Sequence, residues 1–409
     1  MVSRINPLVM ATASPAILES RAWLAAYDGG KGPAIDLSQA APPYPPPPEL
    51  LARLAAAAQS PAAALYGPVP GDYDLRVAYA GHVSELYGAG IRPSEVSITA
   101  GCNQAFVIAA MLVAQAGDAI ILPSPWYFNY KMTLDMLGIE ARVLPCSPAK
   151  DFIPDPGACA DLIDAGVRAV VLVTPNNPTG AIYPPSIIEA FAALCRDSGL
   201  WLILDETYRD FLPQDATRPH RIFQDRTLRN NVLGLYSFSK SFALPGHRLG
   251  AMIYPAELGP EVLKIQDCLQ ICPARAGQAA LTWGLGALDH WRSENRRRFG
   301  EQAQNFRSAL GELQDWTIDS LGAFFAYVRH PFAALPAEQV AKRLAVENGL
   351  LLIPGTYFGP GQEEHLRVSF GNLSAGSLTQ LPERLRLSGA CQAQHSSKAA
   401  GRRENRRKA

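Results

Sequence analysis

A lysine lies among small hydroxylated residues in the segment Tyr236–Gly250, which reads YSFSKSFALPGHRLG. Lys240 follows an apolar stretch that predicts a strand, and Arg248 comes eight residues later. A lysine at a strand end in a dry pocket can lose its proton and form a Schiff base with an aldehyde. Serine hydroxyls and a guanidinium are the donors that a phosphate group needs. Taken alone, the segment could equally be a solvated loop with a surface lysine and arginine.

A carboxylate and a phenol follow another apolar stretch, in the sequence LILDETY over residues 202–208. At the end of a buried strand, both side chains can be placed over one ligand. Asp205 could pair with a protonated pyridine nitrogen, while Tyr208 donates a hydrogen bond to a phenolate oxygen. As a lone motif, the same residues could be a helix N-cap and a core tyrosine.

Two further segments predict sharp turns at strand ends. TPNNPTG at residues 174–180 predicts a tight turn that presents an amide side chain at the carboxyl edge of a sheet. TAGCNQA at residues 99–105 predicts a strand–glycine–helix junction, whose free N–H groups and positive helix end suit an anion. This junction lacks the Lys-Ser/Thr of a nucleotide P-loop and the GxGxxG of a dinucleotide fold. Each segment alone could be a plain connection between elements.

The elements that would position these motifs alternate along the chain. Apolar runs without polar alternation predict strands that are buried on both faces, as in a parallel sheet covered by helices. The repeated strand–helix order predicts an α/β domain with right-handed crossovers. We expect strands at 96–99, 119–122, 140–144, 169–173 and 200–204, and helices at 103–116, 126–137 and 185–198.

The pattern changes near residue 290. A basic helix (290–313), a strand-like AFFAYV and a helix at 337–348 predict a separate, smaller α+β unit. The proline-rich APPYPPPP at 41–48 must be extended, because proline fixes φ and disfavours helix before it. We therefore expect four parts: an N-terminal segment that joins the small domain (1–48), a large domain with the motifs (49–289), the small domain (290–387) and a disordered basic tail (388–409).

Composition excludes several classes of function. The 409 residues are 48% apolar and 18% charged, as in a soluble globular protein. Basic and acidic residues number 37 each, but the tail carries six basic residues and one acid, so the remainder has a net charge of −5 and predicts no nucleic-acid partner. The longest apolar run has ten residues, which is too short to cross a membrane.

The cysteines and histidines predict neither a disulfide framework nor a metal site. Seven scattered cysteines form no CxxC pair, and seven histidines form no HExxH motif. The N-terminus carries no export signal. We therefore expect a protein of the reducing cytoplasm.

In their order and spacing, the motifs resemble those of the class I/II aminotransferases, which are fold-type-I enzymes dependent on pyridoxal 5′-phosphate (PLP). The resemblance covers nearly all of residues 10–387, and it rests on the combination of NNPTG, LDETY and SFSK-x7-R. It implies a large domain with a mostly parallel sheet between helices, and a smaller α+β domain. It also implies PLP as cofactor and transfer of an amino group between an L-amino acid and a 2-oxo acid.

The resemblance implies a role for each matched residue at the cofactor. Lys240 would form the aldimine and carry the proton between the substrate α-carbon and the cofactor. Asp205 would keep the pyridine nitrogen protonated, so that the ring can act as an electron sink. Asn177 and Tyr208 would hydrogen-bond the phenolate oxygen. The phosphate would be held by Gly101, Cys102, Asn103, Ser237, Ser239 and Arg248.

Two aromatic residues are implied by the same resemblance. In PWYFNY the family usually stacks the second residue after the proline on the cofactor ring, which is Tyr127 here, with Trp126 as the alternate. Tyr66, in LYGPVPGDYDLR, matches a tyrosine that the family contributes to the neighbouring subunit's phosphate. A homodimer with shared active sites is therefore implied.

At the substrate, Arg367 in HLRVSF matches the arginine that binds the α-carboxylate, and its planar fork suits that group. Asn177 is implied beside it. Ala40 departs from the family, which usually has glycine there, and the added methyl would narrow the room beside the substrate. Arg275 is a candidate, by chemistry only, for binding a side-chain carboxylate, and we favour a structural role for it.

Three classes of function fit these residues. An aminotransferase is favoured over a lyase of the same fold that cleaves a C–S or other β-bond, or a cyclising enzyme like the aminocyclopropane-carboxylate synthases. All begin by removing the same α-proton, so Lys240 and Asp205 do not separate them. A non-enzymatic PLP-binding regulator is disfavoured, because no helix-turn-helix domain precedes residue 50 and the lysine is present. The amino donor, the oxo acceptor and the pathway stay open.

Overall fold

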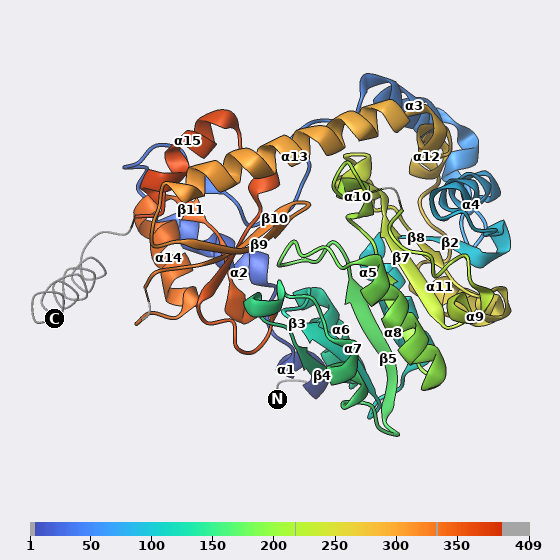
Figure 1. Ribbon diagram of the computed structural model, residues 1–409. Coiled ribbons are helices and arrows are strands. Elements are labelled where there is room, and N and C mark those ends of the chain that lie inside the picture. The colour runs from blue at the N-terminus through green and yellow to red at the C-terminus, as the bar shows by residue number, and fades with distance from the viewer. Residues whose placement is uncertain (1–4, 217, 333, 387–409) are drawn as a thin grey trace, which may run out of the picture.

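The larger half of the protein is built on a seven-stranded sheet (Figure 1). The computed structural model describes residues 5–216, 218–332 and 334–386. The strand order is β2-β8-β7-β6-β5-β3-β4, and every pairing is parallel except those of β8 with β2 and β7. The strands are β2 (Val96–Thr99), β3 (Ala119–Ser124), β4 (Glu140–Pro145), β5 (Val167–Val173), β6 (Trp201–Asp205), β7 (Val232–Ser237) and β8 (Gly250–Ile253).

Alternate residues of the central strands enter two different cores. On β5, Val170 and Leu172 pack in one core, and Val171 and Val173 pack in the other. Because both faces are covered, the strands are apolar throughout. The first core includes side chains of α4 (Tyr73–Tyr87), α8 (Pro185–Asp197) and α12 (Arg275–Ala287), and the second includes side chains of α5 (Cys102–Val113), α6 (Phe128–Leu137) and α11 (Gly259–Gln270).

A separate four-stranded antiparallel sheet has the order β12-β13-β10-β9. Its strands are β9 (Thr317–Gly322), β10 (Phe325–Arg329), β12 (Ile353–Pro354) and β13 (His365–Val368). A third core joins it to α13 (Asp289–Gly311), α14 (Ala337–Asn348) and α15 (Ala375–Arg384). Helix α13 runs from this small sheet to the helices beside the large one (Figure 1).

The N-terminal segment lies with the small sheet. Strand β1 (Ile35–Asp36) pairs in parallel with β11 (Leu350–Leu351), and Ile35 and Leu37 are buried in the third core. This pairing supports the predicted division of the chain at residues 48 and 289, which stays a prediction. The remaining helices are α1 (Pro7–Ala11), α2 (Ala16–Trp23), α3 (Pro48–Gln59), α7 (Pro156–Ala160), α9 (Arg226–Arg229) and α10 (Phe238–Ser241).

The predicted fold class is confirmed: a mostly parallel sheet between helices is joined to a smaller antiparallel sheet with helices. The helix predicted at 103–116 ends earlier, at Val113, because Ala114 has an extended backbone. The antiparallel β8 is not foreseen by the strand–helix pattern. Within the described ranges, every helix is too short or too polar to span a membrane. The predicted tail, 388–409, lies outside the described residues.

Candidate active site

A cavity of about 400 Å³ lies at the carboxyl ends of β5, β6 and β7. Parallel strands end at the same edge of a sheet, so the residues that follow them meet there. Ten of the predicted site residues line this cavity: Cys102, Asn103, Tyr127, Asn177, Asp205, Tyr208, Ser237, Ser239, Lys240 and Arg248. The structure thus brings together side chains from motifs more than a hundred residues apart.

Lys240 lies on the single turn of α10, directly after β7. Its Nζ donates a hydrogen bond to the carbonyl oxygen of Ala40. Burial, together with the positive charges of Arg248 and Arg367, lowers the pKa of Lys240 to about 8. At pH 7 about a tenth of this amine is therefore uncharged and can act as a nucleophile or a base.

Asp205 is the last residue of β6, and 4% of it is exposed. Its Oδ1 accepts hydrogen bonds from the Thr207 amide (2.8 Å) and the Cys102 thiol (3.5 Å), and its Oδ2 accepts one from the Tyr130 hydroxyl (2.5 Å). Burial raises the pKa of Asp205, while these donors lower it. A carboxylate oxygen accepts two hydrogen bonds, so Oδ2 retains room for a donor from a ligand in the cavity.

The end of the cavity near α5 suits an anion with several oxygens. Gly101 caps α5 without a side-chain hydrogen bond, and the first-turn amides of a helix have no intrahelical acceptor. A Cβ at Gly101 would lie 2.4 Å from Nη2 of Arg248, and the φ of Gly101 is +82°, so another residue would strain the backbone and displace the guanidinium. Arg248 itself bonds only to the carbonyl oxygens of Pro245 and Ala100 in the described chain. The buried Ser239 hydroxyl has no partner, so donors are in excess here.

Arg367, on β13, is not among the residues that line the cavity, but it contacts the lining residue Asn177, and 2% of it is exposed. Its Nη1 donates to Oδ1 of Asn177 (2.9 Å), and its Nη2 donates to the carbonyl oxygen of Ser38. The guanidinium lies 5.1 Å over the ring of Phe325 and 5.0 Å over that of Phe358. Burial lowers the pKa of Arg367 to about 10. Within the described ranges this buried cation contacts no carboxylate, and its Nε has no partner, so it is suited to an anionic ligand.

The segment from Asp36 to Ala41, here called the strap, lies against both cations. Its backbone is fixed by hydrogen bonds from Leu37 to Leu351 (2.9 Å) and from Ser369 to Leu37 (2.9 Å). The Gln39 side chain lines the cavity and accepts a hydrogen bond from Arg21 (2.8 Å). The strap therefore belongs to the site, although its sequence carries no strong motif.

Ala40 presents its carbonyl oxygen, and not its methyl group, to Lys240. The residue is buried in a cluster with Tyr208, Phe211 and Phe324, and it is absent from the cavity lining. The expectation that its methyl narrows the substrate space stays a prediction. Tyr208 packs edge-on against Phe325, with the ring centroids 5.2 Å apart.

The two aromatic candidates at β3 differ in position. Tyr127 lines the cavity, and its ring lies edge-on to that of Tyr130 at 5.3 Å. Burial raises its pKa to about 12, so its hydroxyl is protonated at neutral pH. Trp126 packs in the second core of the large sheet and does not line the cavity.

Tyr66 lies outside its own chain's cavity and is 80% exposed. Arg275 holds the neighbouring segment: its Nε pairs with Asp72 (3.1 Å), and its Nη1 donates to the carbonyl oxygen of Ala62 (2.7 Å). These contacts support the structural role that we favour for Arg275.

Sequence reasoning missed three polar residues that line the cavity: Gln39, Tyr130 and Thr207. Tyr130 carries no motif signal, because Tyr127 precedes the first residue of α6 and the two do not share a helix face. Sequence reasoning also missed the partners of Glu206. This buried carboxylate accepts from the Tyr87 hydroxyl (2.6 Å) and pairs with His220 (3.2 Å), which anchors the loop after Asp205.

Comparisons with known proteins agree with this geometry. Residues 33–385 match the family described as aminotransferase class I and II. An aromatic aminotransferase of Arabidopsis thaliana is 30% identical over 78% of this chain and 81% of its own length. The valine–pyruvate aminotransferase of Mycobacterium tuberculosis is 31% identical over 80% of this chain and 82% of its own length.

Solved structures show the same fold. The aspartate aminotransferase of Thermus thermophilus, solved with maleate, superposes with a TM-score of 0.85 at 24% identity, covering 94% of this chain and 99% of its own. Enzymes of this family depend in general on PLP. The relatives are named as aminotransferases, which gives no support to the lyase alternative. On its matched residues, its fold and its relatives, the chain belongs to the class I and II aminotransferases and is an enzyme that transfers amino groups.

Proposed function

We propose that this chain binds PLP in the cavity at the ends of β5, β6 and β7, and uses it to move an amino group from an L-amino acid to a 2-oxo acid. The observation that carries the proposal is the placement of Lys240 and Asp205 on one cavity, with unpartnered anion donors beside α5 and the buried Arg367 bonded to the lining residue Asn177. When bound, PLP supplies an electron sink for the substrate α-carbon.

The phosphate of PLP would lie at the α5 end. Arg248 and the Ser239 hydroxyl have free hydrogen-bonding capacity there, and the amides of Cys102 and Asn103 belong to the unpartnered first turn of α5. Ser237 lines the same end, and its hydroxyl oxygen accepts a hydrogen bond from the Ser239 amide (3.3 Å). The absent Cβ of Gly101 leaves room for the Arg248 guanidinium. These donors fit a doubly charged group with three oxygens.

The remaining cavity residues fit the ring. Asp205 would accept a hydrogen bond from the pyridine nitrogen, while Asn177 and Tyr208 would donate to the phenolate oxygen, and Tyr127 would cover one face. Asn177 can do both of its tasks, because its Oδ1 faces Arg367 and its amide NH₂ remains to donate.

Lys240 and Arg367 would act on the substrate. We assign Lys240 as the attachment point for PLP and as the base that takes the α-proton, because burial leaves its amine partly uncharged. Arg367 would bind the α-carboxylate through its planar fork. Among the described lining residues, Lys240 and Arg248 are the only cations, and both have proposed roles at the cofactor.

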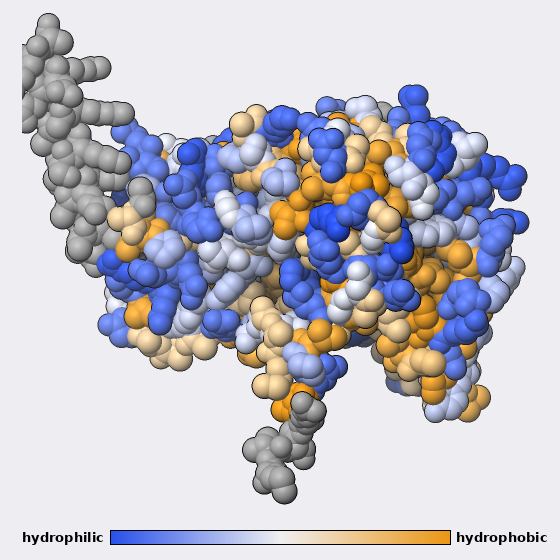
Figure 2. Space-filling view, turned by 90° about the horizontal axis from the view of Figure 1, so that it is seen from below, coloured by the Kyte–Doolittle hydropathy of each residue, from blue (hydrophilic) through white to orange (hydrophobic). Residues whose placement is uncertain are grey.

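We also propose a homodimer with shared sites. Exposed apolar side chains gather around Tyr66: Leu65 is 68% exposed, and Gly67 donates to the Cys272 sulfur (3.3 Å), which follows the exposed Ile271. Helix α1 is a second exposed apolar element, seen projecting beside the grey N-terminal residues in Figure 2.

The six described cysteines are free thiols, which supports a cytoplasmic location.

Two measurements test the assignment. Borohydride reduction followed by mass spectrometry should place the pyridoxyl group on Lys240, and label on another lysine would reject it. A screen of L-amino acids should convert the yellow protein to a stable pyridoxamine form for the true donor. Release of pyruvate and ammonia instead would indicate a lyase.

Hybrid dimers test the shared site. Tyr66→Phe should weaken PLP binding, and Lys240→Ala should abolish turnover. Mixing the two variants gives some dimers with one unmutated site if Tyr66 serves the opposite subunit, so activity should partly recover. No recovery, with subunit exchange shown by mass spectrometry, would overturn the shared-site proposal.

A further inference from the structure

The turn after β5 and the turn between β9 and β10 touch through two glycines. A Cβ on Gly180 would lie 2.4 Å from the amide nitrogen of Gly322 and 2.6 Å from the carbonyl oxygen of Phe325. A Cβ on Gly322 would lie 2.2 Å from the carbonyl oxygen of Gly180. All three neighbours are backbone atoms, so a methyl group on either glycine requires the two turns to separate.

Both turns are held firmly on their own side. The Gly180 amide donates to the carbonyl oxygen of Asn176 (2.8 Å), whose side-chain Oδ1 accepts from the amide (3.1 Å) and hydroxyl (2.8 Å) of Thr179. Gly322 ends β9 and pairs with Phe325 across the turn to β10. Neither turn can therefore move without breaking these hydrogen bonds or this strand pairing.

The two turns connect directly to the site. Asn177, in the first turn, accepts the hydrogen bond from Arg367 (2.9 Å). Phe325, after the second turn, lies 5.1 Å beneath the Arg367 guanidinium and edge-on to Tyr208. Strand β10 pairs with β13, where Tyr327 stands opposite Arg367. The position of β10 thus fixes the position of the arginine.

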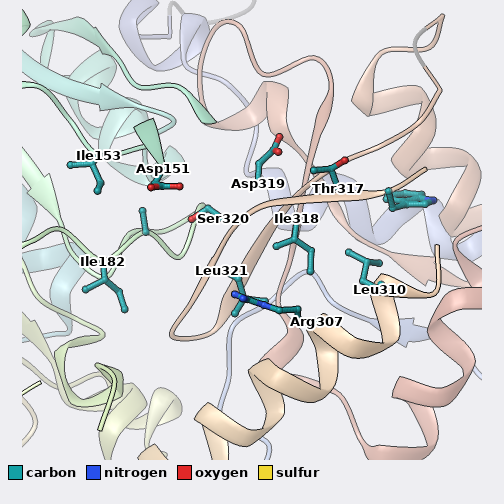
Figure 3. Close-up of a pocket in the computed structure, with 13 residues that line it drawn as sticks. Asp151, Ile153, Ile182, Arg307, Leu310, Thr317, Ile318, Asp319, Ser320 and Leu321 are labelled. Carbon is teal, nitrogen blue, oxygen red and sulfur yellow. The ribbon is translucent and has the colours of Figure 1, made fainter. Parts of the chain in front are cut away.

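Beside this contact the two halves of the protein face one another across a cavity of about 600 Å³ (Figure 3). Asp151, Ile153 and Ile182 lie on one side, and Ile318 and Leu321 lie on the other, on β9. Strand β9 is the edge of the small sheet. Along this stretch side chains do not fill the gap, and the halves meet beside it through the backbone contact of the glycines.

We propose that Gly180 and Gly322 are positioning residues whose backbone contact sets the distance between the small sheet and the cofactor half, and thereby the place where Arg367 meets the substrate carboxylate. The inference rests on the proposed function of Arg367. It predicts that a methyl group at this contact impairs carboxylate recognition while the phosphate contacts, which lie on α5 and after β7, stay intact.

Gly322→Ala is the principal variant, because Gly322 has no positive φ that would strain alanine. Two probes differ by one carboxylate: 2-aminoisobutyrate, which lacks an α-proton, and isopropylamine. Their binding to the PLP-loaded protein is followed by the change in cofactor absorbance. We expect the Kd of 2-aminoisobutyrate to rise about 10- to 100-fold, the loss expected when hydrogen bonds between charged groups are displaced, while the Kd values of isopropylamine and PLP change less than about twofold.

Three further variants make the result decisive. Gly300→Ala on α13 is the matched control, because a Cβ there meets open space, and it should change none of the three Kd values. Gly180→Ala provides a second test if Gly322→Ala does not fold, with the added backbone strain of alanine at the φ of +75° of Gly180. The Kd of 2-aminoisobutyrate for the double variant should exceed that of the more impaired single variant by only a small factor, because both methyl groups break one contact.

Arg367→Ala separates the two proposals. If it leaves the Kd of 2-aminoisobutyrate unchanged, the proposed function of Arg367 is wrong. If it weakens that Kd while folded Gly322→Ala does not, the inference about the glycines is wrong. Equal weakening of both amine probes and of PLP by Gly322→Ala would also overturn it, because the contact would then support the fold and not the carboxylate site.

Discussion

The two ends of the active site are assembled in different ways. At the cofactor end, Asp205, Ser237 and Lys240 follow two adjacent strands of one sheet, and the motifs that contain them are short. At the carboxylate end, Arg367 bonds to Asn177, 190 residues away, and to Ser38, 329 residues away. One end is therefore fixed within a single buried sheet, whereas the other exists only where two sheets and the strap meet.

This difference separates binding of the cofactor from recognition of the substrate. A change at the carboxylate end should alter substrate affinity without releasing PLP, because the phosphate donors lie on α5 and after β7. Conversely, a change at the cofactor end should affect every substrate alike. Mutations that fail to respect this separation would show that the two ends are one mechanical unit.

The largest effect is expected for Lys240→Ala. Turnover should fall at least about 10³-fold, because the amine that lines the cavity is both nucleophile and base. PLP should still bind, as measured by equilibrium dialysis. Lys264→Ala, which removes an exposed lysine paired with Glu261, is the control and should be silent. Loss of PLP together with activity would mean that the phosphate donors do not hold the cofactor alone.

Arg367→Ala should have the next largest effect. The fall in kcat/KM should correspond to a loss of about 3–5 kcal/mol of transition-state stabilisation, as for a buried charge pair that loses one partner. The Kd of PLP should stay the same. Arg275→Ala is the matched control, because its partly exposed pair with Asp72 should contribute at most about 1 kcal/mol to stability. Equal losses in the two variants would remove the distinction between a binding arginine and a structural one.

The pH dependence of PLP attachment should report Lys240. Burial and the two guanidiniums disfavour the protonated amine, so its pKa is about 8, and the amine becomes unreactive as the pH falls below that value. The attachment rate, followed by absorbance, should fall about tenfold per pH unit below 8 and level off above 9. Arg367→Ala should move the midpoint upward. A midpoint near the ordinary lysine value would contradict the buried environment.

Tyr130→Phe should have the smallest effect, less than about tenfold on turnover. It removes a donor from Oδ2 of Asp205, so the pKa of this carboxyl rises and the pyridine nitrogen loses part of its proton. The ¹⁵N resonance of labelled PLP should move toward that of neutral pyridine. Tyr254→Phe, which loses a buried hydrogen bond to Ser97 instead, should leave the resonance unchanged. A shift in both variants would indicate a general change in the core.

The contrast also explains what the sequence could predict. The sequence predicts Asp205 and Lys240 as site residues because each lies beside a strongly apolar strand, and parallel strands bring their ends together. It does not predict Tyr130, because the contact of Tyr130 with Asp205 depends on how α6 is rotated over β6. The contacts of Ser38 and Ala40 use carbonyl oxygens, which every residue possesses, so no side-chain motif marks them. Gly322 likewise is marked by no side-chain motif, because its proposed role depends on the absence of a Cβ.

The strap has a consequence for how this enzyme can diverge. It contacts Arg367 and Lys240 through main-chain oxygens of Ser38 and Ala40, and these persist through most substitutions. Gln39, between them, lines the cavity, and its exposed side chain accepts a hydrogen bond from Arg21. Mutation can therefore vary the shape and polarity of the pocket at one codon while the chemistry on either side of it is inherited unchanged. The strap is a place where new substrate preferences can arise without loss of the catalytic apparatus.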